Sequence, residues 1–181
     1  MEQVEYSHIP SQVAHSVFSP EEPSLSLSKR IIEIATDKQI KLATAESCTG
    51  GLVAALFTEQ PGASVLDRAF VTYSIEAKQE MIGVPPELIA AHGVVSSEVA
   101  KAMVQGALAF SRAQVAVSIT GWAGPSGDNV GLVWLGAGRK VQKQEGENEV
   151  TIVTVEKRFG DIGRGLVRRE AARTALELML T

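Results

Sequence analysis

The sequence of 181 residues predicts an α/β fold: a three-layer α/β/α sandwich with a mixed, mostly parallel sheet and a C-terminal antiparallel hairpin. Short apolar runs of strand length alternate with runs of helical period, which is typical of a sheet covered by helices on both faces. The last two apolar runs are joined by the polar turn "KQEGENE", which favours a hairpin. Hydrophobic residues make up 45% of the chain, enough for a buried core.

The chain divides into an arm and one domain. Residues 1–24 are rich in serine, proline and acidic residues without a sustained period, so we expect a flexible or loosely packed arm. Residues 25–181 form the single domain. Its predicted elements are a helix over 25–38, strand 40–46, helix 52–60, strand 64–74, helix 99–108, strand 113–120, strands 132–138 and 151–159, and helix 167–178.

Local signals bound several of these elements. The proline and glycine at 61–62 end the second helix. The paired prolines at 85–86 begin a stretch that we expect to be rich in turns. Ser96 or Ser97 can cap the helix that follows this stretch.

Two glycine-rich loops follow predicted strands, "ESCTGG" at 46–51 and "TGWAGPSG" at 120–127. Ligands of α/β sheets gather beyond the carboxyl ends of strands, and glycines let backbone amides approach them closely. If both loops face one crevice, their amides can hold a phosphate or an oxyanion. The simpler interpretation is that Ser47 or Thr49 caps the next helix, with Cys48 a small buried hydrophobic residue.

A nucleophilic serine needs a base, and the histidines do not offer a good one, since only His92 lies inside the domain. A lysine can serve if burial or a nearby cation keeps it largely deprotonated. Lys78 lies just beyond the second predicted strand, and the phenol of Tyr73 is placed to relay a proton or to hold the amine. The ordinary alternatives are a solvated lysine and a tyrosine packed on the strand.

Two arginines, Arg164 and Arg168, lie four residues apart near the start of the last helix. Cations at this end oppose the helix dipole, which favours anions. A bound anion such as a phosphate would remove that conflict. A solvated basic face beside Glu170 is the alternative.

Composition excludes several classes of function. The net charge of -4 argues against direct nucleic-acid binding, for which a basic surface is usual. The three histidines lack ligand spacing, so we predict no metal site. Because Cys48 is the single cysteine, no internal disulfide can form. With no apolar run of membrane-spanning length and no signal peptide, we expect a cytoplasmic protein that does not bind membranes.

Several motifs occur in the order of one known family. "AESCTGG", "FVTYSIEAKQEMIGV", "HGVVS", "VSITGWAGPSG" and "VGLVW" together resemble the CinA C-terminal family, the nicotinamide mononucleotide deamidases also called PncC. The resemblance runs from about residue 25 to the C-terminus. It implies hydrolysis of the carboxamide of nicotinamide mononucleotide to nicotinic acid mononucleotide and ammonia, with no metal or organic cofactor, by a protein that forms a homodimer.

The resemblance also assigns roles to residues. Ser47 corresponds to the family nucleophile, and Lys78 and Tyr73 correspond to the lysine and tyrosine that activate it. The remaining predicted site residues bind the oxyanion or the substrate, and they are Cys48, Thr49, Gly50, Gly51, Thr120, Gly121, Arg164 and Arg168.

The sequence departs from the family pattern in two places. The loop at 121–131 is shorter than usual and contains Trp122, and the segment at 158–169 is rearranged around Gly163. Two other functions therefore stay open: a serine–lysine amidohydrolase for another small amide, and a catalytically silent nucleotide-binding or interaction protein. Ser47 and Lys78 side chains lying far apart would favour the silent protein.

Overall fold

A computed structural model describes residues 18–19, 22–142 and 148–181. Most of the predicted arm at 1–24 and the tip of the predicted hairpin turn lie outside these residues. The first helix, α1 (Pro23–Asp37), begins where the arm was expected to end. In the part of the chain described, no helix combines the length and apolar character needed to cross a bilayer.

Five strands form one sheet in the order β2-β1-β3-β4-β5. Their bounds are β1 (Leu42–Glu46), β2 (Leu66–Val71), β3 (Val115–Gly121), β4 (Leu132–Gln142) and β5 (Asn148–Arg158). Strand β1 pairs in parallel with β2 and β3, and β4 pairs antiparallel with β3 and β5. The sheet is therefore mixed, and it ends in the predicted antiparallel hairpin.

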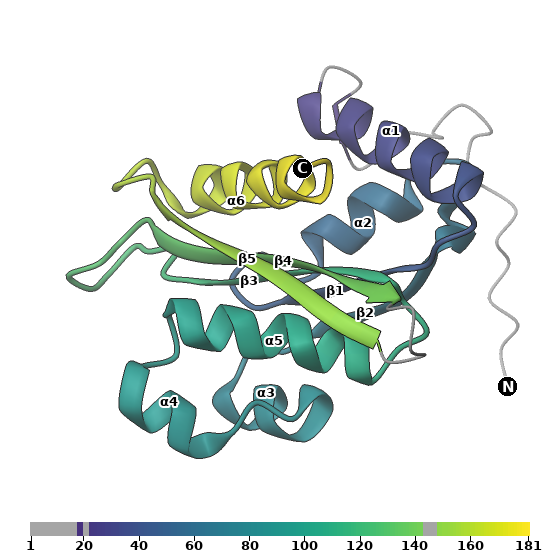
Figure 1. Ribbon diagram of the computed structural model, residues 1–181. Helices are drawn as coiled ribbons and strands as arrows, with labels where there is room; N and C mark the ends of the chain where they lie inside the picture. Colours follow the sequence, from purple (N-terminus) through teal and green to yellow (C-terminus); the bar gives the residue numbers. More distant parts are fainter. Residues whose placement is uncertain (1–17, 20–21, 143–147) are drawn as a thin grey trace, which may run out of the picture.

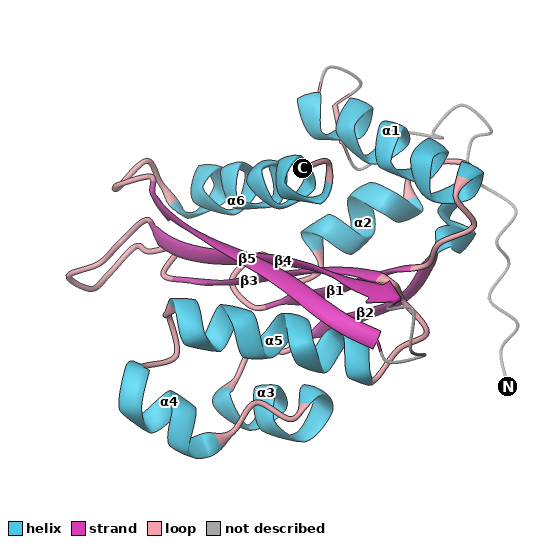
Figure 2. Cartoon of the chain, in the orientation of Figure 1, coloured by secondary structure: helices cyan, strands magenta, loops and turns pink. Residues whose placement is uncertain are grey.

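Helices cover both faces of the sheet, which confirms the three-layer α/β/α prediction (Figure 1). On one face lie α1, α2 (Leu52–Thr58) and α6 (Arg164–Met179), and on the other α3 (Ile75–Ile82), α4 (Pro86–His92) and α5 (Ser97–Ala109). A short 3-10 turn, η1 (Ala63–Val65), precedes β2. Figure 2 shows the alternation of strands and helices that the hydrophobic pattern predicted.

Two hydrophobic cores flank the sheet. The core under α1, α2 and α6 contains Leu42 and Phe57, and the core under α3, α4 and α5 contains Ala45 and Met103. Complete burial of a side chain as large as Leu42 contributes about 2 kcal/mol. Every residue of β1 is buried, because this central strand has a neighbour on each side and helices on each face. Strand β1 therefore ends at a fixed position inside the molecule.

Two short helices were not expected from the sequence. The stretch predicted to be turn-rich contains α4, whose first residue is Pro86, a position where the missing amide proton costs nothing. Helix α3 begins where the Ser74 hydroxyl accepts from the Ala77 amide at 3.0 Å, and it ends at Gly83 in the left-handed region. The second strand is correspondingly shorter than predicted, so Tyr73 lies in a loop and Lys78 lies in α3.

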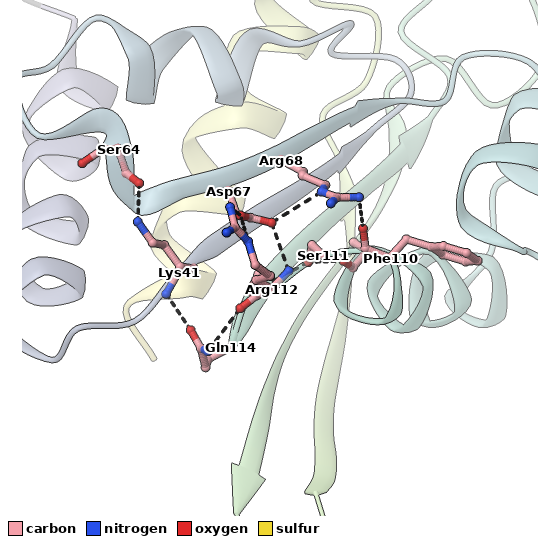
Figure 3. A network of polar contacts seen from close by, with 10 residues as sticks. Lys41, Ser64, Asp67, Arg68, Phe110, Ser111, Arg112 and Gln114 are labelled. Atoms are coloured by element: carbon pink, nitrogen blue, oxygen red, sulfur yellow. Dashed lines mark hydrogen bonds and ion pairs between the residues drawn. The ribbon is translucent and has the colours of Figure 1, made fainter.

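A polar network ties together the amino ends of the three parallel strands (Figure 3). The Asp67 carboxylate accepts from the Arg112 backbone amide at 3.0 Å and from Arg112 Nε at 2.8 Å. The Lys41 amide donates to Gln114 Oε1 at 2.6 Å, and Lys41 Nζ donates to the Ser64 carbonyl at 2.7 Å. These bonds fix the start of each strand, and hence the depth at which its other end emerges.

Candidate active site

Ser47 and Lys78 meet at the carboxyl ends of the parallel strands. Ser47 is the first residue after β1, and its amide extends the ladder by donating to the Ile119 carbonyl of β3 at 3.0 Å. Lys78 reaches it from α3, with 3.0 Å between Lys78 Nζ and Ser47 Oγ. The structure therefore brings together the two side chains whose separation would have favoured a silent protein.

The Lys78 side chain is completely buried. Its ammonium group donates to the Thr72 carbonyl at 2.7 Å and lies 3.4 Å from the Tyr73 carbonyl, besides its bond to Ser47. Burial lowers the pKa of Lys78 to about 8. At that pKa roughly a tenth of the amine is neutral at pH 7, against well under a thousandth for an ordinary lysine.

The partners of Lys78 determine where its lone pair points once the amine is neutral. A neutral amine offers two N–H donors and one acceptor, whereas a backbone carbonyl can only accept. The carbonyls of Thr72 and Tyr73 therefore take the two N–H groups, which leaves the lone pair for the Ser47 hydroxyl. This arrangement makes Lys78 suited to accept the serine proton.

The start of α2 is capped by Glu46, not by Ser47 or Thr49 as the sequence suggested. Glu46 is fully buried, and its two carboxylate oxygens accept from the Val53 amide at 3.1 Å and from the Ala54 amide at 2.9 Å. A carboxylate satisfies two orphan helix amides and complements the helix dipole, which a single hydroxyl cannot do. The capping interpretation of the two hydroxyl residues was therefore wrong, and Ser47 Oγ is left to face Lys78.

The turn between β1 and α2 presents backbone amides beside Ser47. Gly50 and Gly51 adopt positive φ values of 63° and 91°, which reverse the chain within a few residues. The Gly50 amide donates to the Ser47 carbonyl at 3.0 Å. Among the described residues, the amides of Cys48, Thr49 and Gly51 donate no hydrogen bond to another residue, which makes this turn a candidate to hold an oxyanion.

Cys48 itself is a buried thiol, as the simpler interpretation of its sequence position expected. Burial raises its pKa to about 11, so the sulfur stays protonated and weakly nucleophilic near neutral pH. Of the two adjacent candidates in this turn, the chemistry therefore favours the serine.

A pocket of about 290 Å³ opens in front of Ser47. The loop after β3 supplies part of its wall, including Thr120, Gly121 and Trp122, so the two glycine-rich loops do face one crevice. The Thr120 hydroxyl donates to the Val94 carbonyl at 2.8 Å, so Thr120 braces the wall through its side chain. Trp122 is 47% exposed and offers a flat aromatic surface to a ligand.

Tyr73 lies at the mouth of this pocket and is 61% exposed. Its phenol oxygen accepts a hydrogen bond from Arg164 Nη2 at 3.2 Å. Among the described residues, it is the Tyr73 carbonyl and not the phenol that contacts Lys78. The expectation that the phenol holds the amine is therefore corrected: Tyr73 positions the lysine through its backbone.

The two arginines have separate surroundings. Arg164 lines the pocket, where Nη1 donates to the Gly124 carbonyl at 2.8 Å and thus joins the start of α6 to the loop after β3. Arg168 lies outside that pocket and donates through Nη2 to the Thr49 carbonyl at 2.8 Å. Arg164 is therefore placed to meet a ligand, whereas Arg168 supports the turn that follows Ser47.

The two segments that depart from the family pattern pack against each other. Gly131 has a φ of 84°, and a Cβ atom there would come within 2.4 Å of the Gly160 backbone. The Gly131 carbonyl also accepts from the Phe159 amide at 2.9 Å. The short loop after β3 and the rearranged segment before α6 therefore form one continuous rim beside the pocket.

Side chains that could ligate a metal ion do not cluster among the described residues of this region. In the ranges that the structure covers, no group of three or more His, Cys, Asp or Glu side chains is arranged to hold a metal ion. His8 and His15 lie outside those ranges.

The sequence and the structure of this chain are similar to those of known proteins. The family model described as the CinA C-terminal domain matches residues 24–181. A structure titled the competence/damage inducible protein CihA from Agrobacterium tumefaciens superposes with a TM-score of 0.79 at 42% identity, covering 87% of this chain and 93% of that one. A competence damage-inducible protein A from Klebsiella pneumoniae superposes with a TM-score of 0.73 at 30% identity, covering 86% and 94%.

Curated relatives are longer than this chain. A putative competence-damage inducible protein of Caldicellulosiruptor bescii is 47% identical over 119 residues, which are 63% of this chain and 29% of that protein. A CinA-like protein of Mycobacterium tuberculosis is 49% identical over 114 residues, which are 62% and 26%. The chain thus matches less than a third of the length of these two relatives.

Proposed function

Because this chain belongs to the family of CinA C-terminal domains, we propose that it is a nicotinamide-nucleotide amidase. It hydrolyses the carboxamide of nicotinamide mononucleotide to nicotinic acid mononucleotide and ammonia. The observation that carries this proposal is the 3.0 Å contact between Ser47 Oγ and the buried Lys78 Nζ beside a pocket. A nucleophile within hydrogen-bond reach of a base is the minimal machinery for acyl transfer.

The first half of the reaction forms an acyl-serine. Ser47 Oγ attacks the carboxamide carbon while its proton passes to neutral Lys78 Nζ. The amides of Cys48 and Thr49, with the Gly121 amide across the pocket, stabilise the oxyanion of the tetrahedral intermediate. Thr120 supports this wall through its bond to the Val94 carbonyl. The Lys78 ammonium then returns the proton to the departing nitrogen, the C–N bond breaks, and ammonia leaves.

The second half regenerates the enzyme. A water molecule attacks the acyl-serine carbon and gives a proton to Lys78, which passes it to Ser47 Oγ as the ester bond breaks. The carboxylate product remains. In both halves the Thr72 and Tyr73 carbonyls keep the lysine directed at the serine, which is how Tyr73 contributes to the proposed chemistry.

The substrate phosphate needs a cation at the pocket, and Arg164 provides one. A bound phosphate would compete with the Tyr73 phenol for the Arg164 guanidinium. Arg168 acts on the same site indirectly, by holding the Thr49 carbonyl and thereby the turn that presents the amides.

One observation favours a second candidate, an amidase for another small amide. The short loop and the rearranged segment, which depart from the family pattern, contribute Trp122 and Arg164 to the pocket wall, and they form the continuous rim beside it. The chemistry of the pair would be unchanged, and the difference would lie in the substrate. Assembly as a homodimer and a cytoplasmic location stay predictions.

The test is to incubate the purified chain with nicotinamide mononucleotide and measure ammonia and the acid product. Parallel reactions with nicotinamide riboside and with free nicotinamide separate the two candidates. Preference for the mononucleotide supports the main proposal, and equal turnover of all three favours the second candidate. No turnover of any amide, in a preparation whose circular dichroism is that of a folded α/β protein, overturns both.

A further inference from the structure

Trp122 is a residue of the pocket wall to which the proposed reaction gives no role. It follows β3 directly, lines the same pocket as Ser47, and is 47% exposed. It also lies in the loop at which this chain departs from the family pattern. An indole that is half exposed at the wall of the pocket is available to a bound ligand.

The backbone of Trp122 is held through both its amide and its carbonyl. The amide donates to the Leu132 carbonyl at 2.8 Å, and the carbonyl accepts from the Gly131 amide at 2.8 Å. Two consecutive residues at the start of β4 thus face one residue, and the first of them, Gly131, has a φ of 84°. This is the arrangement of a β-bulge that begins with a left-handed glycine, a feature common beside active sites. The support of the indole is therefore rigid, which lowers the ordering cost of binding a ligand there.

The lining of the pocket offers no carboxylate to a ligand. Of the described residues that line it, none is acidic, and Arg164 is the charged one. Much of the remaining wall is small or apolar, including Val94, Val95 and Ala123. A positively charged part of a ligand therefore finds no ion-pair partner in this wall, and the face of an aromatic ring is the alternative that attracts a cation.

Two aromatic side chains line the pocket, and their surroundings differ. The Tyr73 phenol accepts from Arg164 Nη2 at 3.2 Å, so this side chain is already bonded to a cation. Arg164 directs its other printed-length bond, of 2.8 Å, to the Gly124 carbonyl and not to Trp122. Indole is also the aromatic group that attracts cations most strongly. Trp122 is therefore the better platform for a positively charged ring.

We propose that the Trp122 indole stacks on the ring that carries the scissile carboxamide and selects rings that are flat and positively charged. This inference rests on the proposed function, whose substrate has a pyridinium ring with both properties. With the ring on Trp122 and the phosphate at Arg164, the positive charge of the ring is kept away from the guanidinium. Stacking also fixes the plane of the ring, and thereby the orientation of the carboxamide toward Ser47.

The test compares two ligands that differ only in the ring. Nicotinamide mononucleotide and its reduced form share the phosphate, the ribose and the carboxamide, but the dihydropyridine ring of the reduced form is neutral and not aromatic. Dissociation constants are measured by isothermal titration calorimetry in the Ser47→Ala background, where the proposed reaction cannot consume either ligand. Adding Trp122→Leu is expected to raise Kd about tenfold for the oxidised ligand and less than about threefold for the reduced one. Trp122→Phe, which keeps a weaker aromatic face, should lie between wild type and Trp122→Leu.

Two controls show whether the effect belongs to this position. Phe110 is 50% exposed and does not line the pocket, so Phe110→Leu in the same background should leave both dissociation constants unchanged. Fluorescence gives a second readout, because the chain has two tryptophans and a pyridinium ring stacked on an indole quenches its emission. Quenching by nicotinamide mononucleotide should persist in Trp134→Phe and disappear in Trp122→Phe. Circular dichroism checks that each variant is folded.

Three results overturn the proposal: no binding of either ligand, an unchanged Kd for the oxidised ligand in Trp122→Leu, or equal increases for both ligands. Quenching that survives in Trp122→Phe overturns it as well. Failure of the proposed function would look different. Binding that depends on Trp122 without hydrolysis by the wild type would overturn the function alone, whereas hydrolysis with an unchanged KM in Trp122→Leu would overturn this inference alone.

Discussion

A buried ionisable side chain lies near each end of strand β2, and the two side chains have different kinds of partner. At the amino end, the Asp67 side chain is 1% exposed and is paired with the Arg112 guanidinium at 2.7 Å (Figure 3). At the carboxyl end, Lys78 is equally buried, but its hydrogen-bond partners in the described chain are one hydroxyl and two carbonyls. Bonds from the Arg112 amide and side chain lower the pKa of Asp67, whereas burial lowers the pKa of Lys78.

The difference separates a group that stabilises the fold from one that serves chemistry. A lowered pKa keeps Asp67 charged, and its hydrogen-bond and ion-pair partners stabilise that charged form. A lowered pKa favours the neutral form of Lys78. Its hydroxyl and carbonyl partners can hydrogen-bond a neutral amine, and a general base must be neutral to accept a proton. The same strand thus begins in a structural ion pair and ends beside a candidate catalytic base. If this contrast is correct, changes at the two ends will affect different measurable quantities.

The largest effect is expected at the carboxyl end. Ser47→Ala and Lys78→Met should each lower kcat/KM for nicotinamide mononucleotide by at least about 1,000-fold, because nucleophile and base act as a unit. Asp67→Asn is the matched control at the other end and should leave the rate within about twofold, since Asp67 contacts nothing in the pocket. Equal losses in all three variants, measured on folded protein, would show that the contrast is not functional.

A smaller effect is expected at the pocket rim. Arg164→Ala should raise KM for nicotinamide mononucleotide by about 10- to 100-fold, the value of one or two charge-assisted hydrogen bonds to phosphate. Its effect on nicotinamide riboside, which lacks the phosphate, should be much smaller. Arg169→Ala, an exposed arginine of the same helix that does not line the active-site pocket, is the control. Equal KM changes for both substrates would contradict a contact between Arg164 and the substrate phosphate.

At the amino end the expected effect is on stability. Asp67→Ala removes the acceptor of the Arg112 amide and guanidinium, so unfolding by urea should show a loss of about 1–2 kcal/mol at pH 7. Because the folded-state pKa of Asp67 is lowered, its contribution is present above the unfolded pKa of about 3.9 and is lost as pH falls through the folded value. A loss that persists in strong acid would contradict the ion-pair explanation.

The smallest expected effect is on how steeply the free energy of unfolding changes with pH. Lys78 has a folded pKa of about 8, below the unfolded value of about 10.4, so the unfolded chain binds more protons between these values. The contribution of Lys78 to the free energy of unfolding of the wild type should therefore increase with pH between about pH 8 and 10.4. Lys78→Met should lack that component, and urea titrations of both proteins across this range would show whether it does.

Much of this contrast was accessible from the sequence. The alternation of apolar runs predicted the layers, and two glycine-rich loops after strands predicted where a ligand pocket would lie. Lys78 was identified because it follows the second strand, and parallel neighbouring strands end at the same edge of a sheet. These are consequences of periodicity and topology, which local sequence carries.

What the sequence did not reveal depended on long-range packing. Glu46 precedes Ser47 in the same motif, but only the depth of β1 shows that its carboxylate meets the first amides of α2. The side chain of Tyr73 turned to Arg164, which is 91 residues away in the sequence. Helices α3 and α4 are too short for a clear hydrophobic period, although Pro86 at a first helical position and Ser74 as a cap were usable signals.

The most direct test of the central claim, that neutral Lys78 is the base for Ser47, is the pH dependence of kcat/KM for nicotinamide mononucleotide. In the free enzyme the rate should rise with pH as Lys78 loses its proton and level off above a midpoint near pH 8, the pKa that burial gives this lysine. A rate independent of pH between 6 and 10, or a rise whose midpoint is unchanged in a residually active Lys78→Arg variant, would contradict it.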